Sequence, residues 1–157
     1  MNKKTCCFTG HRNIPAAEYP EIQTKLMAKI IELVQGGVHD FHVGGGRGFD
    51  TMAALNVLHL KKWHPEIRLV FVFPCKNYTK GWREEDKKIV SLILDWADYV
   101  VYTSDEYHEN CEQKCDQYLV RRSDICVCYL TKPESGTAET VDYARQEGLE
   151  IINIAEI

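Results

Sequence analysis

The architecture of the chain can be predicted from the segment Phe41-His42-Val43-Gly44-Gly45-Gly46-Arg47-Gly48-Phe49-Asp50-Thr51. A short apolar run, Phe41 to Val43, is followed by four glycines in five positions, and a pattern of helical period then runs from Met52 to Trp63. A strand, a glycine turn and a helix in this order are typical of the β-turn-α units that build parallel sheets.

The same alternation recurs along the whole chain. The apolar runs are rich in Val, Ile, Phe, Tyr and Cys without polar alternation, as expected of strands that are covered on both faces. They span residues 5–8, 41–43, 69–73, 99–102, 125–130 and 151–154, and the helical segments lie at about 20–34, 52–63, 82–96, 110–122 and 137–146. We therefore predict an α/β, Rossmann-like fold, with a mostly parallel sheet of about six strands, helices on both faces and a single domain over residues 1–157.

The third helical segment contains an aromatic residue with two interpretations. Trp82 could stack on a base or fill the core. It shares a helical stripe with Ile89, Ile93 and Trp96, and this spacing favours the core.

Composition excludes several classes of protein. The chain has 157 residues, of which 45% are hydrophobic and 27% charged, with a formal net charge of -4. An acidic balance argues against a partner such as nucleic acid that is held by bulk positive charge. No apolar stretch approaches the roughly 20 residues of a membrane span, and the first residues lack a signal-peptide core. We therefore expect a cytoplasmic protein with no membrane partner.

The seven cysteines do not form a metal-binding pattern. Cys111 and Cys115 share a face of the fourth helical segment, and Cys126 and Cys128 share a face of a strand, but neither pair has the C-x-x-C spacing of zinc sites. An odd number of cysteines also disfavours a disulfide framework. We predict buried apolar roles for the strand cysteines and no metal site.

Ligands of open parallel sheets bind beyond the carboxyl ends of the strands, so the loops there are the candidate site. After the first strand, Thr9 offers a hydroxyl, Gly10 lets the backbone approach a ligand, and Arg12 offers a forked donor for phosphate. His11 lies in the same loop. We interpret this segment as part of a phosphate site.

The glycine loop after the second strand is the strongest candidate. Its backbone N–H groups can surround an anion at the start of a helix. It is neither a Walker loop nor G-x-G-x-x-G, because no Gly-Lys-Ser/Thr follows and Phe49 replaces the last glycine. Asp50 either caps the helix or accepts hydrogen bonds from a ribose.

A third loop enters the last helix through Ser135, Gly136 and Thr137, which can donate hydrogen bonds to a second phosphate or a sugar edge. Thr137 can also cap the helix, and the two roles are compatible. Together the three loops give a predicted ligand-binding set of Thr9, Gly10, His11, Arg12, Gly44, Gly45, Gly46, Arg47, Gly48, Asp50, Ser135, Gly136, Thr137 and Thr140.

The order and spacing of these motifs resemble the YpsA-like branch of the SLOG superfamily, which also includes the DprA DNA-processing proteins and the LOG phosphoribohydrolases. The resemblance implies a Rossmann-like domain that binds a nucleotide or a nucleotide-derived ligand of the NAD, ADP-ribose or nucleoside phosphate type. Self-association of relatives implies a homo-oligomer. The resemblance rests on Thr9-Gly10-His11-Arg12, Gly48-Phe49-Asp50, Pro74, Trp82, Ala97-Asp98, Ser123-Asp124 and the run from Ser135 to Ala144.

The sequence departs from the enzymes of this superfamily at a decisive position. LOG enzymes cleave the N-glycosidic bond of nucleoside monophosphates with a Gly-Thr-x-x-Glu segment and an upstream arginine. Thr140 occupies the position of that glutamate, and Glu139 is about 100° away around the helix. Cys115 and Gln117 also stand where relatives of this branch tend to carry basic residues.

Two functions follow from these observations. The first is binding or sensing of the nucleotide-type ligand without catalysis, because the loops favour anions but lack a convincing acid-base or nucleophile set. The alternative is an N-glycosidic hydrolase or transferase, in which Asp50 or Glu139 supplies the carboxylate and His11 the proton donor. A DprA-like role on single-stranded DNA is disfavoured, because no basic, aromatic-rich groove is evident.

Overall fold

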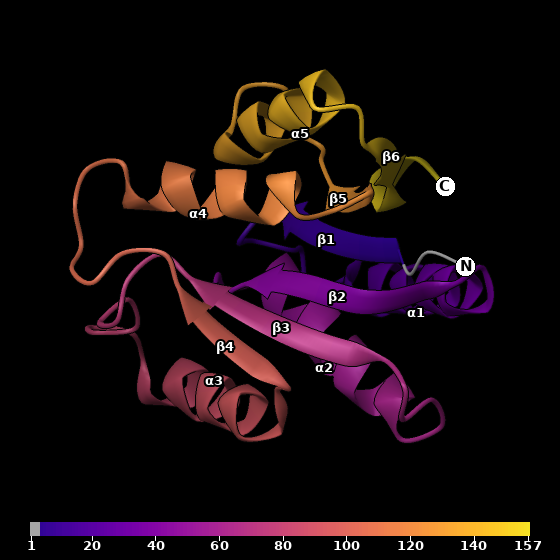
Figure 1. Ribbon diagram of the computed structural model, residues 1–157, viewed down its shortest axis with the longest axis horizontal. Helices are drawn as coiled ribbons and strands as arrows, with labels where there is room; N and C mark the ends of the chain where they lie inside the picture. The colour runs from indigo at the N-terminus through magenta and orange to yellow at the C-terminus, as the bar shows by residue number, and fades with distance from the viewer. Residues whose placement is uncertain (1–3) are drawn as a thin grey trace.

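The computed structural model describes residues 4–157, where strands and helices alternate as predicted (Figure 1). Element boundaries lie within a few residues of those expected. The strands are β1 (Lys4–Gly10), β2 (Val38–Gly44), β3 (Arg68–Phe73), β4 (Tyr99–Tyr102), β5 (Ile125–Tyr129) and β6 (Glu150–Asn153). The helices are α1 (Tyr19–Gln35), α2 (Phe49–Lys61), α3 (Glu84–Trp96), α4 (Cys111–Arg121) and α5 (Gly136–Gln146), followed by the 3-10 helix η1 (Ile154–Glu156).

The six strands of the described chain form one sheet in the order β4-β3-β2-β1-β5-β6, and every pairing in it is parallel. This arrangement confirms the predicted fold class. The chain extends the sheet in one direction from β1 to β4, and it then crosses back to place β5 on the other side of β1. The point between β1 and β5 is where the winding reverses, which is the usual ligand position in open α/β sheets.

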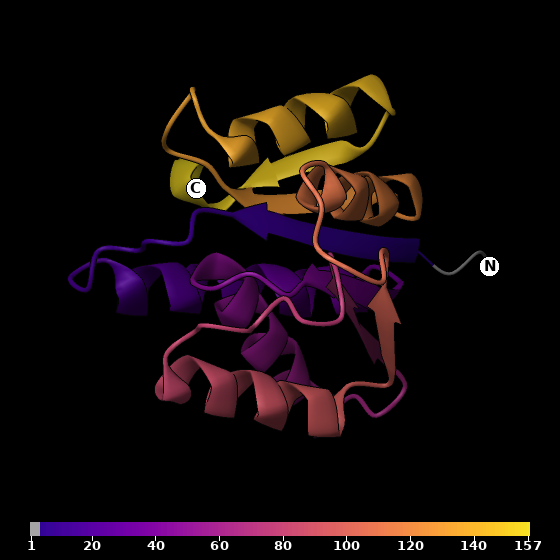
Figure 2. The ribbon, with the colours of Figure 1, turned by 90° about the vertical axis from the view of Figure 1, so that its left-hand side faces the viewer.

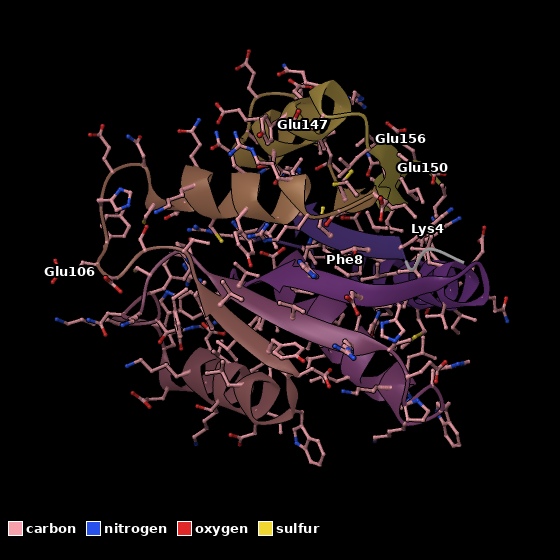
Figure 3. All side chains as sticks on the ribbon, in the orientation of Figure 1. Lys4, Phe8, Glu106, Glu147, Glu150 and Glu156 are labelled. Atoms are coloured by element: carbon pink, nitrogen blue, oxygen red, sulfur yellow. The ribbon has the colours of Figure 1, made fainter. Side chains whose placement is uncertain are left out.

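The reversal distributes the helices between the two faces of the sheet. Because crossovers between parallel strands are right-handed, α1, α2 and α3 cover one face, and α4 and α5 cover the other. Figures 1 and 2 show the two groups on opposite sides of the sheet. The larger core lies under α1 to α3 and includes Phe8, Phe41 and Phe71. Figure 3 shows Phe8 in the interior and Glu106 in a peripheral loop.

Two aspartates fix the starts of β4 and β5 against their neighbouring strands. The backbone N–H of Asp124 donates to the carbonyl of Thr5 at 2.8 Å, and its Oδ2 accepts the Thr5 N–H at 2.9 Å. Asp98 makes the same pair of bonds with Leu69, at 2.9 and 2.8 Å. These residues, which belong to the motifs used for the family resemblance, therefore set the alignment of β5 with β1 and of β4 with β3.

The predicted stripe of the third helix is wrong at Ile89 and Trp96, which are 37% and 67% exposed. Trp82 lies before α3 but packs against the core, as favoured from the sequence. The buried residues of α3 are Val90 and Ile93. The helix covers the edge of the sheet and buries only a narrow strip, so half of the apolar side chains on it face solvent. Within residues 4–157 no helix combines the length and the apolar character needed to cross a membrane.

Candidate functional site

The three predicted loops converge on one cavity of 390 Å³ beyond the carboxyl ends of β1, β2 and β5, beside the point where the winding reverses. The sheet topology brings these loops together although more than 80 residues separate the second from the third. The predicted residues that line the cavity are Thr9, Gly10, His11, Arg12, Gly44, Gly45, Gly46, Arg47, Asp50, Ser135, Gly136, Thr137 and Thr140.

Two predicted residues lie outside the described cavity lining. Gly48 is the N-cap of α2, with a φ of 74°, and a Cβ built on it would lie 2.1 Å from the backbone oxygen of Arg12. Its role is to let the first and second loops pack together. Glu139, a candidate carboxylate, is exposed on α5 and does not line the described cavity.

Sequence reasoning missed the contributions of α4 and of the loop after β3. Tyr78 comes from that loop, Glu112, Cys115 and Asp116 come from α4, and Lys132 precedes α5. The one available signal was helical spacing, because Glu112 and Asp116 are four residues apart and share a face of α4.

Most glycines of the site make room for the protein itself. A Cβ on Gly10 would lie 2.4 Å from the ring of Phe49, and a Cβ on Gly45 would lie 2.2 Å from the ring of Phe73. The expectation that these glycines imply a ligand is therefore incomplete, since packing alone requires them. Gly136 differs, because a Cβ built there meets no atom of the described residues within 4 Å apart from its chain neighbours and its own helix turn.

The two arginines of the loops are held at the rim of the cavity. Arg12 Nη2 donates to the hydroxyl of Tyr78 at 3.1 Å and to Oε2 of Glu112 at 3.3 Å. The guanidinium of Arg47 lies 5.1 Å from the centre of the Trp82 ring. Trp82 is half-buried against the core, so it supports a rim arginine as well as packing. Both arginines keep further N–H groups that can bind an anion.

His11 is not placed to donate a proton through Nε2. That atom accepts the backbone N–H groups of Thr131 at 2.9 Å and Lys132 at 3.2 Å. Burial, together with the charge of Lys132, lowers the pKa of His11. The imidazole is therefore neutral at neutral pH with its proton on Nδ1, and it orients the loop that leads to α5. The prediction of His11 as the acid for a departing base does not agree with these contacts.

Asp50 is a buried carboxyl in the first turn of α2. It does not cap the helix, because Gly48 occupies the N-cap position. Its Oδ1 is buried without a hydrogen-bond partner among residues 4–157. Burial raises the pKa of Asp50 well above its usual range, and the charge of Asp116 raises it further. A buried acceptor without a donor is unfavourable, so this group is suited to a donor brought by a ligand.

Asp116 is a half-buried carboxyl in the same cavity. Its Oδ2 lies 3.2 Å from Oγ1 of Thr140, which also lies 3.1 Å from the carbonyl oxygen of Gly136. Burial, and secondarily the charge of Glu112, raises the pKa of Asp116 to about 6. A carboxyl group from α4 thus touches Thr140, the residue that replaces the glutamate of the LOG segment.

The described residues contain no cluster of three or more His, Cys, Asp or Glu side chains that could hold a metal ion. All seven cysteines are free and buried. Burial raises the pKa of the Cys115 thiol, and the negative charge of Asp116 adds to this effect. Cys115 is therefore a neutral thiol in the wall of the cavity.

A parallel sheet with a cavity at its winding reversal, rimmed by arginines and by two helix starts, defines a Rossmann-like α/β protein with a candidate ligand site. The chain belongs to the YpsA family, described as the YspA SLOG family, which matches residues 6–155. It is similar to the uncharacterized SPbeta prophage-derived protein YoqJ of Bacillus subtilis (strain 168), with 29% identity over 139 residues, 80% of this chain and 81% of YoqJ. A UPF0398 protein of Bacillus thuringiensis (strain Al Hakam) is 24% identical over 134 residues, 84% of this chain and 73% of that protein.

Two solved structures have the same fold. DNA processing protein A from Helicobacter pylori, which was studied for its single-stranded DNA binding mode, has a TM-score of 0.68 and 15% identity over 94% of this chain and 63% of its own. The Streptococcus pneumoniae protein has a TM-score of 0.70 and 14% identity over 95% of this chain and 49% of its own. At these identities the likeness concerns the fold, and this chain spans only part of the length of either protein.

Proposed function

We propose that the cavity binds a nucleotide or nucleotide-derived ligand through a phosphate group at the start of α5. The observation that carries this proposal is the open space beside Gly136, which lines the cavity. The N–H groups in the first turn of a helix lack carbonyl partners within the helix and attract anions. Ser135 caps α5 by accepting the Ala138 N–H at 3.1 Å, so the N–H groups of Gly136 and Thr137 remain for the phosphate.

The rim adds positive charge to this helix start. Arg12 and Arg47 line the cavity from the first and second loops, and Lys132 lines it beside α5. Each charge-assisted hydrogen bond to a phosphate oxygen contributes about 1.5–3 kcal/mol. A cavity of 390 Å³ also has the size of a small-molecule site, for which about 300–1,000 Å³ is usual.

Calorimetric titration with AMP, NAD and ADP-ribose tests the proposal. We expect at least one of them to bind the wild type, and Gly136→Leu to weaken that ligand at least about tenfold because the side chain fills the phosphate position. Gly36→Ala, at the end of α1 and outside the cavity lining, is the matched control and should bind like the wild type. If all three ligands fail to bind the wild type, or if Gly136→Leu binds normally, the proposal is wrong.

A second candidate function is cleavage of the N-glycosidic bond of a nucleoside monophosphate, and it is favoured by the two carboxyls of the cavity. Such a reaction needs a carboxylate near the sugar and a proton for the departing base. Asp50 and Asp116 line the cavity, in contrast to Glu139. Incubation with AMP should then release adenine, and Asp116→Asn should abolish the release. Absence of free adenine at high protein concentration would eliminate this function.

Single-stranded DNA is a third candidate, suggested by the fold shared with DNA processing protein A. The side chains that line the cavity disfavour DNA, because acidic and basic ones are equal in number. The basic ones are Arg12, Arg47 and Lys132, and the acidic ones are Asp50, Glu112 and Asp116. A polyanion would meet these carboxylates along with the arginines. An electrophoretic shift with an oligonucleotide at low salt distinguishes this candidate, since DNA binding falls steeply as salt is added.

A further inference from the structure

The cavity contains a carboxyl group, that of Asp50, with a hydrogen-bond acceptor that the described residues leave unpaired. The carboxyl of Asp50 lines the cavity, and its buried Oδ1 has no hydrogen-bond partner within residues 4–157. Its other oxygen lies under the glycine loop, where a Cβ built on Gly46 would come within 2.7 Å of Oδ2. Leaving a buried acceptor unsatisfied is unfavourable by about 1–3 kcal/mol. A ligand that donates a hydrogen bond to this carboxyl would remove that penalty.

Asp116 offers a second carboxyl in the lining of the cavity. Thr140 Oγ1 lies within hydrogen-bond distance of both the Gly136 carbonyl and Asp116 Oδ2, yet a hydroxyl has only one proton. That proton is shared between the two acceptors, and the bond to Asp116 lowers the pKa of Asp116 and so opposes the effect of burial. The other oxygen of Asp116 remains for a ligand hydroxyl.

Neighbouring charges act on both carboxyls. Asp50 and Asp116 repel each other's negative charge, Glu112 and Glu139 add further negative charge near Asp116, and Arg12 opposes them. Arg12 is half-exposed and already bonded to Glu112, so it neutralises the two carboxyls only in part. An ionised carboxyl accepts from a neighbouring hydroxyl, and a protonated one can donate to it.

We propose that Asp50 and Asp116 together recognise the two adjacent hydroxyls of a ribose whose 5′-phosphate lies at the start of α5. This inference rests on the proposed phosphate site and names its ligand class as ribosyl phosphates, with 2′-deoxy and 3′-deoxy sugars rejected. A vicinal diol supplies one hydroxyl for each carboxyl. Loss of either hydroxyl removes the ligand's bond to one of the carboxyls, and sites built around such bonds discriminate strongly against the analogue that lacks them.

Calorimetric titration of the full chain with AMP, 2′-deoxy-AMP and 3′-deoxy-AMP tests the proposal. These ligands share the phosphate and the base and differ only in the hydroxyls. We expect AMP to bind the wild type at least about tenfold more tightly than either deoxy ligand. In Asp116→Asn this preference should shrink severalfold, while Asp142→Asn, which changes an exposed carboxylate on α5, should retain it.

The outcomes separate this inference from the proposed phosphate site. Equal binding of the three nucleotides overturns the diol recognition and leaves the phosphate site standing. Binding of none of them, with NAD and ADP-ribose also inactive, overturns both. The wild-type preference is measured without any substitution, so the inference stays testable even if Asp116→Asn does not fold. A preference that is unchanged in a folded Asp116→Asn also contradicts the role given to Asp116.

Discussion

The ring of Phe49 occupies the space that a side chain on Gly10 would need, with Cδ2 only 2.4 Å from the position of a Cβ. Phe49 is fully buried and stacks on Tyr129 at 6.0 Å between ring centres. The start of α2 is thereby pressed against the ends of β1 and β5. The candidate site thus has a rigid aromatic support beneath its first two loops.

Gly10→Ala should therefore destabilise the protein by about 1–3 kcal/mol, because the added methyl group meets a ring that cannot move freely in a packed core. Urea denaturation followed by circular dichroism measures this change. Gly136→Ala is the matched control and should alter the free energy of unfolding by no more than about 0.5 kcal/mol, since its Cβ enters open space. Equal stability of the two variants would contradict the role assigned to Phe49.

The fold could be predicted from the sequence because its signals are local and repeated. Runs such as Phe41 to Val43 and Tyr99 to Tyr102 are apolar over a strand's length, and each is separated from the next by a helical period. Because crossovers between parallel strands are right-handed, only a few topologies then remain possible. The strand order could not be predicted, because the position of β5 beside β1 depends on packing between distant residues. The exposed face of α3 was mispredicted for the same reason, since Ile89 and Trp96 carry no mark of their exposure.

The candidate site was predictable only where it consists of loops that follow strands. The three loops were expected at one edge of the sheet, and they line one cavity. Asp116 escaped prediction because it lies in the middle of a helix, where a carboxylate usually faces solvent. Its hydrogen-bond partner is Thr140 of another helix, which no local pattern reveals. The reason for Gly45 was likewise hidden in its tertiary neighbour, Phe73.

The stability of the protein should depend on the protonation of Asp116. Its folded pKa of about 6 lies above the ordinary value of 3.8, so the native state binds more protons than the unfolded state between these values. The contribution of Asp116 to the free energy of unfolding is fully present below pH 3.8, and it is lost as the pH rises through about 6. Asp116→Asn, which cannot ionise, should therefore gain stability relative to the wild type at pH 8, by at most about 3 kcal/mol, and little at pH 3.5.

Urea denaturation of both proteins at pH 3.5, 5, 6.5 and 8 measures this difference. The raised pKa of Asp50 acts in the same direction and is present in both proteins, so it largely cancels in the comparison. A stability difference that is independent of pH, or one that favours the wild type at pH 8, would contradict the buried state of the Asp116 carboxyl.

Asp124 should contribute to stability through the alignment of β5 with β1. Its Oδ2 accepts the Thr5 N–H, so Asp124→Ala leaves that N–H without its partner, and we expect a loss of about 1–3 kcal/mol. Asp124→Asn retains an acceptor oxygen and should lose less. Asp142→Ala, an exposed carboxylate in a surface ion pair, serves as the control and should change stability by less than about 1 kcal/mol. Comparable losses in Asp124→Ala and Asp142→Ala would show that the strand contact is unimportant.

Arg12 should matter for ligand binding far more than for folding. Its ion pair with Glu112 is half-exposed, with 52% and 45% of the two side chains accessible, and such surface pairs contribute at most about 1 kcal/mol to stability.

A phosphate at the start of α5 would instead receive a charge-assisted bond from Arg12 of about 1.5–3 kcal/mol, which corresponds to roughly tenfold or more in affinity. Arg12→Gln should therefore weaken a bound nucleotide about tenfold or more, with the loss smaller at high salt, while its urea midpoint stays close to that of the wild type. Arg83→Gln removes a similar exposed ion pair outside the described cavity lining and should leave the affinity unchanged. Equal affinities of Arg12→Gln and Arg83→Gln would exclude Arg12 from the phosphate site.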